Sequence, residues 1–410
     1  MRSIKTQYFL GYAVIGSIAP YAPVFLEGRG LDDGQIGLVM SLGGLSVLLM
    51  PVMMGLLADL KLENRLLLRG IFSSTAAALG LLLASQGFWW LLPAFLLYTL
   101  STSPMMSLTD GLLFSVRGLR EAEGKSTPPY HRIRVFGTMG FIAPSIVLYV
   151  LMAYYKAPVD VSLACGIVVA VLAAGNTLRL PSTRGAIGGV TPGPEVPDPH
   201  PRAAQDKGLP TIQAFRCLLQ PDVALFCLAM WLAWITTSAY YTFYPLYLVR
   251  EIGLGEQWLG PISSLGVVPE IGYILAFGWL LKKLGVRWLV TLGLAAIFAR
   301  VALLFAVPTL WVALGTQLIH GMTVLALFVL PPLYLNHRAE PAYRNSIQGL
   351  FAMLVFGTGR IAGNVVSGQI AKHYGGDTIA VFGFASGVAA LSLLLFVLLF
   401  RDRSATQIEP

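Results

Sequence analysis

The chain has 410 residues, of which 56% are hydrophobic and 12% are charged, and its mean hydropathy is +0.71. So little charge cannot cover a water-soluble surface, which excludes a soluble globular protein. Apolar runs of about 20 residues recur along the whole length and predict an all-α polytopic membrane protein, with the lipid bilayer as a partner.

We predict twelve membrane-spanning helices from the apolar runs between charged intervals. In chain order they occupy approximately residues 6–27, 34–58, 66–87, 89–115, 133–155, 159–179, 221–249, 257–281, 287–306, 308–334, 346–370 and 377–400. The first run could be a signal peptide, but it is long, is interrupted by Pro20 and Pro23, and lacks a small-residue cleavage site. We therefore expect a retained helix with a kink at the prolines.

Residues 181–210 form the longest polar interval and are rich in proline and glycine. This composition predicts a flexible cytoplasmic linker. It separates two bundles of six helices each, residues 1–180 and 211–410. Directly after the linker, the stretch TIQAFRCLL predicts a short amphipathic helix at the membrane interface.

The basic residues predict the orientation of the chain. Most of them lie in the intervals on one side of the predicted spans, whereas the other side holds only Arg29, Lys156, Arg250 and Lys372. Because positive charge marks cytoplasmic loops, we expect a cell (inner) membrane protein with both termini in the cytoplasm. This topology accounts for the net charge of +8, so no nucleic-acid partner is expected.

Three ionisable residues, Glu270, Arg300 and His320, lie one each in three successive predicted spans. Counted at about 1.5 Å per residue from the nearest charged loop, Glu270 and Arg300 lie at depths of about 18 and 19 Å. His320 reaches a similar level from the opposite side. Because a lone central charge costs at least about 2.5 kcal/mol, we expect these groups to face one another near the midplane.

These three residues predict a proton or substrate relay, although a purely structural network is an alternative. Glu270 is the only carboxylate deep in the second half and is our first candidate for the proton site. Arg300 cannot readily lose its proton, so it would be the fixed counter-charge that pairs with Glu270. His320 can donate, accept or carry charge, or be a neutral structural histidine.

Further polar residues extend the candidate site. Asp110 in the fourth span and Arg134 at the start of the fifth could form an ion pair, either as part of the proton and substrate machinery or as a static clamp. Arg360 is embedded in the eleventh span, and we expect it to meet the substrate or Asn364. Hydroxylated rings that could stack on a sugar or base occur in spans one and seven, although aromatics are ordinary in membrane helices and the usual role of a single ring is structural; they are Tyr21, Tyr240, Tyr241 and Tyr244.

Two short charged turns at corresponding positions of the two halves indicate a weak internal repeat. The second span ends in GLLADLKLENR, residues 55–65, and the eighth ends in GWLLKKLGVR, residues 278–287. Together with twelve spans and a central loop, the G-x-L-A-D sequence resembles the major facilitator superfamily, which implies two pseudo-symmetric six-helix bundles. The chain departs from the usual signature after Asp59, where leucine, lysine and leucine follow.

Two segments resemble nucleoside:proton symporters. They are PPYHRIRVFGTMGFI, residues 128–142, and AYRNSIQGLFAML, residues 342–354. The pattern of Glu270, Arg300 and His320 is more similar to the lactose and phenylpropionate permeases. The resemblance implies proton-coupled symport, and it implies substrate or proton contacts for Arg134, Thr138, Phe141 and Glu270. The carboxylate that nucleoside symporters carry in span ten has no counterpart near Thr323, which leaves the solute open.

We therefore expect a secondary transporter that carries a small polar solute, nucleoside-like or sugar-like, together with protons by alternating access. Alternatives are an aromatic-acid permease, a drug or metabolite antiporter, and a non-transporting membrane sensor. No ATP-binding or metalloprotease motif occurs, and the three cysteines have no metal-ligand spacing, so no enzyme activity, cofactor or metal is expected. We expect the chain to work as a monomer.

Overall fold

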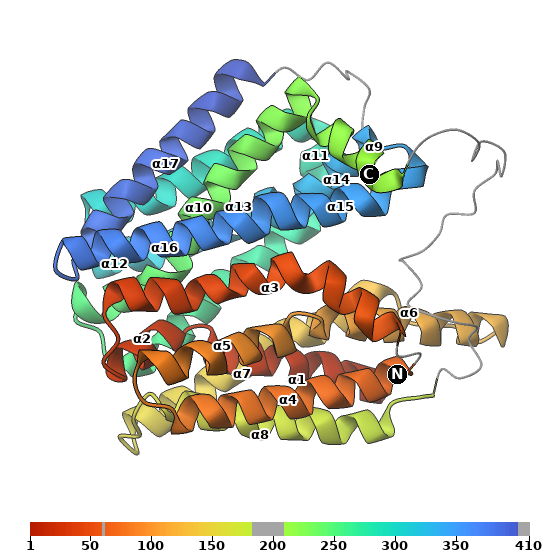
Figure 1. Cartoon of the computed structure of the whole chain (residues 1–410), viewed down its shortest axis with the longest axis horizontal. Coiled ribbons are helices and arrows are strands. Elements are labelled where there is room, and N and C mark those ends of the chain that lie inside the picture. The colour runs from red at the N-terminus through yellow and green to blue at the C-terminus, as the bar shows by residue number, and fades with distance from the viewer. Residues whose placement is uncertain (60–61, 183–208, 401–410) are drawn as a thin grey trace. The chain divides into compact units, whose positions relative to one another are not determined.

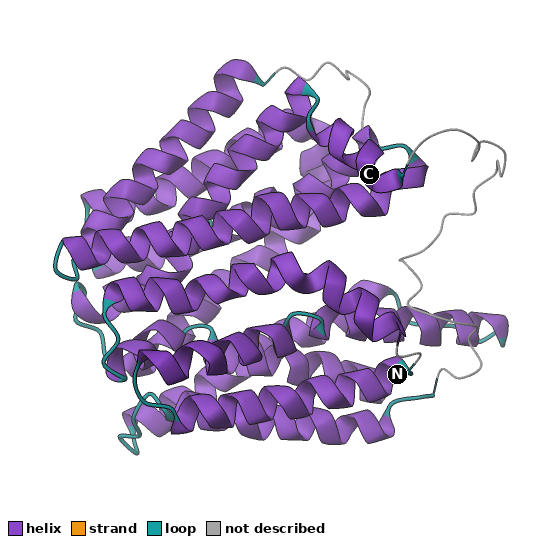
Figure 2. Cartoon of the chain, viewed as in Figure 1, coloured by secondary structure: helices purple, strands orange, loops and turns teal. Residues whose placement is uncertain are grey.

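The computed structural model describes residues 1–59, 62–182 and 209–400. Within these ranges it consists of helices and connecting loops, with no strand (Figure 2). The expected all-α class is thereby confirmed. Most of the expected linker, residues 183–208, lies outside the described residues.

The contacts divide the chain into two compact units, and unit 1 contains Met1–Leu31, Leu49–Arg202 and Glu256–Pro261. In this unit α1 packs against α7 and α8, and α4 packs against α5 and α8 (Figure 1). Its helices are α1 (Arg2–Ile18), α2 (Ala22–Gly28), α4 (Asn64–Ala84), α5 (Phe88–Thr102), α6 (Met105–Ala122), α7 (Tyr130–Ala153), α8 (Val161–Asn176) and the short η1 (Thr177–Arg179) and η2 (Glu256–Trp258).

Unit 2 contains Asp32–Leu48, Ala203–Gly255 and Ile262–Pro410. In it α10 packs against α16 and α17, and α9 packs against α15. Its helices are α9 (Pro210–Leu218), α10 (Pro221–Arg250), α11 (Leu259–Ala306), α12 (Leu310–Leu318), α13 (His320–Val324), η3 (Leu325–Val329), α14 (Leu330–Arg338), η4 (Pro341–Tyr343), α15 (Arg344–Phe351), η5 (Ala352–Gly357), α16 (Thr358–His373) and α17 (Thr378–Leu399). Helix α3 (Asp33–Asp59) contributes its first half to unit 2 and its second half to unit 1.

Within the described ranges, nine helices are long and apolar enough to cross a membrane, and eleven if each of two bent pairs forms one span. The first bent pair is α1 and α2, whose axes bend by 41° at a break that contains Pro20, where the sequence predicts a kink. The stretch Glu256–Ala306 counts once, although non-helical Gly285 divides α11 into two arms. These arms correspond to the expected spans 257–281 and 287–306.

Glycines let α1 and α7 approach each other closely. A Cβ atom on Gly140 would lie 2.0 Å from the carbonyl oxygen of Phe9, and one on Gly16 would lie 2.2 Å from that of Phe141. Because both obstacles are backbone atoms, no rotamer change can relieve such an overlap. The two helices must separate if either glycine gains a side chain.

We expect Gly140→Ala to destabilise unit 1 by about 1–3 kcal/mol, the usual cost of overpacking a close contact. Gly118, in the interior of α6, is the matched control because its Cβ would meet nothing within 4 Å. There alanine should be neutral or stabilising by up to about 1 kcal/mol, since alanine favours helix more than glycine does. Thermal unfolding of both purified variants measures the difference, and equal melting temperatures would contradict this packing.

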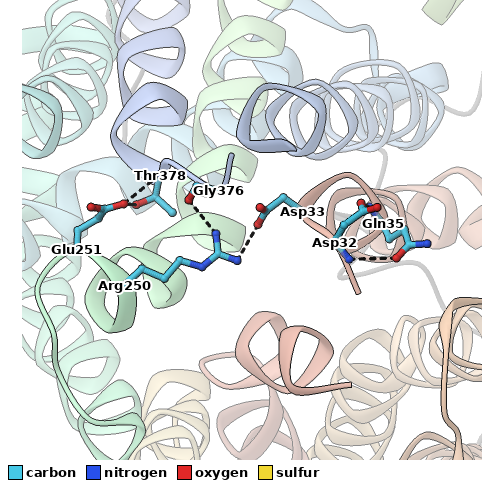
Figure 3. Close-up of polar contacts among 7 residues, drawn as sticks. All are labelled: Asp32, Asp33, Gln35, Arg250, Glu251, Gly376 and Thr378. Carbon is cyan, nitrogen blue, oxygen red and sulfur yellow. Dashed lines mark hydrogen bonds and ion pairs between the residues drawn. The ribbon is translucent and has the colours of Figure 1, made fainter. Parts of the chain in front are cut away.

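Ion pairs hold the first half of α3 at the end of unit 2 where α10 ends and α17 begins (Figure 3). Arg250 contacts Asp33 at 2.9 Å and donates to the carbonyl of Gly376, also at 2.9 Å. Lys372 lies 3.1 Å from Asp32. Two of the few basic residues on this side of the predicted topology, Arg250 and Lys372, therefore form ion pairs with the start of α3 and the residue before it.

Acid should weaken one of these pairs. Partial burial by itself raises the pKa of the Asp32 carboxyl, but the N–H of Gln35 and the ammonium of Lys372 outweigh it and hold that pKa below its ordinary value. A carboxyl whose pKa is lowered by folding stabilises the folded state when the pH is above its ordinary pKa. That stabilisation is lost as the pH falls through the lowered pKa of the folded state. We expect stability to decline below about pH 4, with a smaller decline in Asp32→Asn, measured by thermal unfolding between pH 3 and 7.

Candidate functional site

The centre of the candidate site in unit 2 is a buried guanidinium on the second arm of α11. Arg300 is 3% exposed, and its Nη1 lies 2.9 Å from Nδ1 of His320. Its Nη2 donates to the hydroxyl of Tyr240 at 2.7 Å and to Oε1 of Gln317 at 2.8 Å. The guanidinium carbon lies 3.9 Å from the centre of the Tyr240 ring. Hydrogen bonds and a cation–π contact thus compensate much of the cost of burying this charge.

Helix breaks bring these groups together. Gly285 has φ 73° and ψ 168°, so the helical path of α11 breaks there, with Glu270 on one arm and Arg300 on the other. The tenth span bends by 50° between α12 and α13, which makes His320 the first residue of the new helix. A Cβ atom on the next residue, Gly321, would lie 2.8 Å from the Cα of Glu270. The histidine therefore sits where α13 comes closest to the acidic arm.

His320 lies between the base and the acid. Its Nε2 is 3.9 Å from Oε2 of Glu270, and its other ring nitrogen faces Arg300. Because a guanidinium has only donors, Nδ1 must accept, and a neutral ring then carries its proton on Nε2, toward Glu270. A second proton on His320 would oppose the Arg300 donor directly. In this geometry a neutral His320 presents its Nε2 proton toward Glu270, at 3.9 Å, which is longer than a direct hydrogen bond.

The three residues that the sequence places at one depth thus meet in the structure. The expected direct pairing of Arg300 with Glu270 is replaced by the series Arg300, His320, Glu270. The reason is steric and electrostatic, because Gln317 and Tyr240 occupy the Nη2 edge of the guanidinium and His320 occupies the Nη1 edge. Glu270 keeps part of its surface, with its side chain 25% exposed.

The tyrosines of α10 divide into supporting and exposed rings. Tyr240 and Tyr244 stack at 4.7 Å, and the hydroxyl of Tyr244 donates to the carbonyl of Ala313 at 2.9 Å. Both rings are buried and their hydroxyls are engaged. Tyr241 is 42% exposed and lies edge-on to His320 at 6.2 Å. Among these three, Tyr241 presents surface beside the Glu270 series.

Two candidates on α16 have separate surroundings. Asn364 is 1% exposed and accepts a hydrogen bond from Thr242 at 2.8 Å, so it ties α16 to α10. Arg360 packs against the first half of α3, where a Cβ atom on Gly43 would lie 2.6 Å from the guanidinium carbon. Asn364 is therefore hydrogen-bonded to Thr242, and the guanidinium of Arg360 packs against Gly43.

In unit 1, tyrosines surround Asp110 of α6. Its carboxylate accepts hydrogen bonds from the hydroxyls of Tyr8 and, at 3.2 Å, Tyr130. The guanidinium of Arg134 lies over the ring of Tyr12 at 4.1 Å. No ion pair between Asp110 and Arg134 occurs in the described part of the chain, so the expected pair is replaced by a hydroxyl cradle and a cation–π contact.

The remaining candidates of unit 1 differ in exposure. Thr138 and Phe141 follow Arg134 on α7 and are partly exposed. Tyr21 is fully buried beside Gly260, so its ring belongs to the core of unit 1 in this structure.

Sequence reasoning missed Gln317, Tyr8 and Tyr130. Gln317 precedes His320 by three residues, about one helical turn, and an amide in an apolar span next to a histidine is a usable signal. The two tyrosines carry no such signal, because their contact with Asp110 joins three different helices. Within the described ranges, no group of three or more His, Cys, Asp or Glu side chains is placed to hold a metal ion.

Comparison with known proteins assigns the fold and the family. Residues 1–382 match the MFS_1 like family. The chain is similar to the nucleoside permease NupG of Escherichia coli, with 24% identity over 97% of this chain and 95% of that protein. It is also similar to the xanthosine permease of Escherichia coli, with 22% identity over 92% and 89%, and to the uncharacterized transporter YwbF of Bacillus subtilis, with 23% identity over 100% and 96%.

Solved structures share this architecture. The crystal structure of the nucleoside transporter NupG superimposes with a TM-score of 0.80 at 20% identity and covers 97% of this chain and 98% of that one. A crystal structure of the peptide transporter POT has a TM-score of 0.71 at 14% identity and covers 97% and 93%. At such identities the likeness establishes the fold alone.

Proposed function

The chain belongs to the MFS_1-like family of major facilitator transporters, and we propose that it carries a nucleoside across the membrane together with protons. The relatives named above are transporters and permeases, in agreement with the expectation that the chain is not an enzyme. Two of them are named for nucleosides or xanthosine, which supports a nucleoside as the solute. The observation that carries the proton coupling is the series Arg300, His320, Glu270.

In the proposed mechanism, Glu270 is the proton carrier. When it is charged, the Nε2–H of the neutral His320 faces it at 3.9 Å, and the fixed positive charge of Arg300 lies on the other side of the imidazole ring. When Glu270 takes up a proton, that attraction is lost and the acidic arm of α11 is released. Binding and release of one proton thus changes which contacts hold α11 to α13, and this difference can be coupled to alternating access.

Solute binding is assigned to partly exposed polar and aromatic groups. In unit 2 this group is Tyr241, which is 42% exposed and lies beside His320. In unit 1 the strip Arg134, Thr138 and Phe141 on α7 offers a charge, a hydroxyl and a ring, which together suit the polar and aromatic parts of a nucleoside. Tyr240 and Tyr244 support Arg300, and we assign them positioning roles. Asp110, held by two tyrosine hydroxyls, is proposed as a second protonatable group.

The proposed setting follows from the distribution of charge. We place the protein in the inner membrane with both termini in the cytoplasm, with residues 181–210 as the linker between bundles 1–180 and 211–410. The small-molecule solute and protons are its proposed partners, and the monomer is its proposed working form.

The test is uptake of labelled nucleosides into proteoliposomes, with and without an inward proton gradient, compared with sugars and aromatic acids. Accumulation of nucleosides that requires the gradient supports the proposal. Gradient-dependent accumulation of sugars or aromatic acids alone would show that the solute is not a nucleoside, while the proposed proton coupling would stand. Nucleoside exchange that ignores the gradient would overturn the coupling, and binding without any movement of solute would favour a sensor.

A further inference from the structure

A small cavity lies behind Arg300, inside unit 2. Its volume is about 10 Å³, and its walls come from α10, α11 and α13. The lining includes Thr237, Tyr240, Arg300, Val301 and Thr323. A space of this size is close to the smallest that holds one water molecule, and it excludes any organic ligand.

Three polar atoms of the lining residues have no hydrogen-bond partner among the residues that the structure describes. They are Oγ1 of Thr237, Nε of Arg300 and Oγ1 of Thr323. Each of these residues is 3% exposed, so bulk water does not reach them. Buried polar groups are normally hydrogen-bonded, and three exceptions around one cavity call for a common partner.

We infer that a single ordered water molecule occupies this cavity and binds Arg300 Nε and the hydroxyls of Thr237 and Thr323. Water accepts from the Nε–H, and each hydroxyl can either donate to it or accept from it. Three hydrogen bonds are the usual number for a buried water. The positive charge of the guanidinium disfavours a metal cation in the same place.

The water completes the anchoring of Arg300. His320, Tyr240 and Gln317 hold the two terminal nitrogens, and the water holds the remaining N–H. Arg300 is then fixed on every edge. Given the proposed coupling, Arg300 and His320 stay in place during transport, and the moving partner is Glu270. Thr237 and Thr323 act as positioning residues for the arginine.

The test uses valine, which has nearly the shape of threonine and lacks the hydroxyl. We expect Thr323→Val and Thr237→Val to lower the melting temperature by about 2–4 °C, because the water loses a partner and Arg300 is less well held. Thr323→Ser keeps the hydroxyl and should recover much of the loss. Thr316→Val is the matched control, because that buried hydroxyl bonds to the carbonyl of Ala313 in its own helix and lies outside the cavity.

If the cavity holds no water, the threonine-to-valine substitutions should not lower the melting temperature. Removing an unpaired buried hydroxyl would then leave the melting temperature unchanged or raise it, and Val301→Ile would stabilise by filling space. Either result would overturn the inference, as would a structure of the wild type at water-resolving resolution with no density within about 3.2 Å of Arg300 Nε. These measurements need neither solute nor gradient, so they fail or succeed independently of the proposed function.

A further readout separates positioning from general stability. A less firmly held Arg300 should shift the pH midpoint of nucleoside uptake in Thr323→Val, with recovery in Thr323→Ser and no shift in Thr316→Val. An unchanged midpoint in Thr323→Val would confine the water to a purely structural role and overturn the positioning claim.

Discussion

Glu270→Gln is expected to abolish accumulation driven by a proton gradient while leaving solute exchange intact. Glutamine keeps the shape and the polarity of glutamate, but it cannot bind and release a proton. One pH unit of gradient supplies about 1.4 kcal/mol per proton, enough for about tenfold accumulation with one coupled proton. The variant should lose that tenfold factor. Uptake of labelled nucleoside into proteoliposomes, with and without the gradient, measures it, and counterflow measures exchange.

The matched control is Glu123→Gln, the same substitution at a residue outside the network, whose carboxylate pairs with Lys125 at the end of α6. It should accumulate solute like the wild type. Full gradient-driven accumulation by Glu270→Gln would assign the proton to another group, of which Asp110 is the next candidate. Loss of both accumulation and counterflow would make Glu270 a binding residue.

Loss of Arg300 should have the largest effect on stability. Arg300→Gln removes the guanidinium donors to His320, Tyr240 and Gln317 at once, and it leaves Glu270 and His320 without the fixed positive charge. Breaking a buried charged network in this way costs about 3–5 kcal/mol. We expect a much lower melting temperature and no coupled transport.

Arg300→Lys should restore little of that loss, because one ammonium cannot reproduce the geometry of the guanidinium bonds. The control Arg179→Gln changes an exposed arginine. It should leave the free energy of unfolding within about 0.5 kcal/mol of the wild-type value. A lysine variant that matches the wild type in both stability and coupling would show that charge alone is needed and that the bond network is incidental.

Hydropathy and the cost of buried charge predict much of this fold. Helix lengths follow from the apolar runs, and the kink follows from Pro20. The meeting of Glu270, Arg300 and His320 follows from their equal depth. Depth counting has no angular information, however, so the order of the three could not be predicted. That order depends on the break at Gly285 and on the bend before His320, which are set by backbone geometry.

Contacts between distant helices were harder to foresee. The sequence places Asp110 and Arg134 at similar depths. In the structure, two tyrosine hydroxyls donate hydrogen bonds to Asp110, and the guanidinium of Arg134 lies over a tyrosine ring. Tyrosines are frequent in membrane helices, so their presence does not reveal which acid they bind. Likewise, the attachment of the first half of α3 to unit 2 depends on pairs such as Asp33 with Arg250, which join residues more than 200 positions apart.

Proton movement caused by the solute tests the central claim most directly. Proteoliposomes without any imposed gradient would receive a nucleoside from outside, and the external pH would be followed with an electrode. We expect the medium to become more alkaline as solute and proton enter together, and we expect no pH change with Glu270→Gln. Entry of labelled nucleoside at the wild-type rate with no accompanying pH change would contradict proton coupling through Glu270.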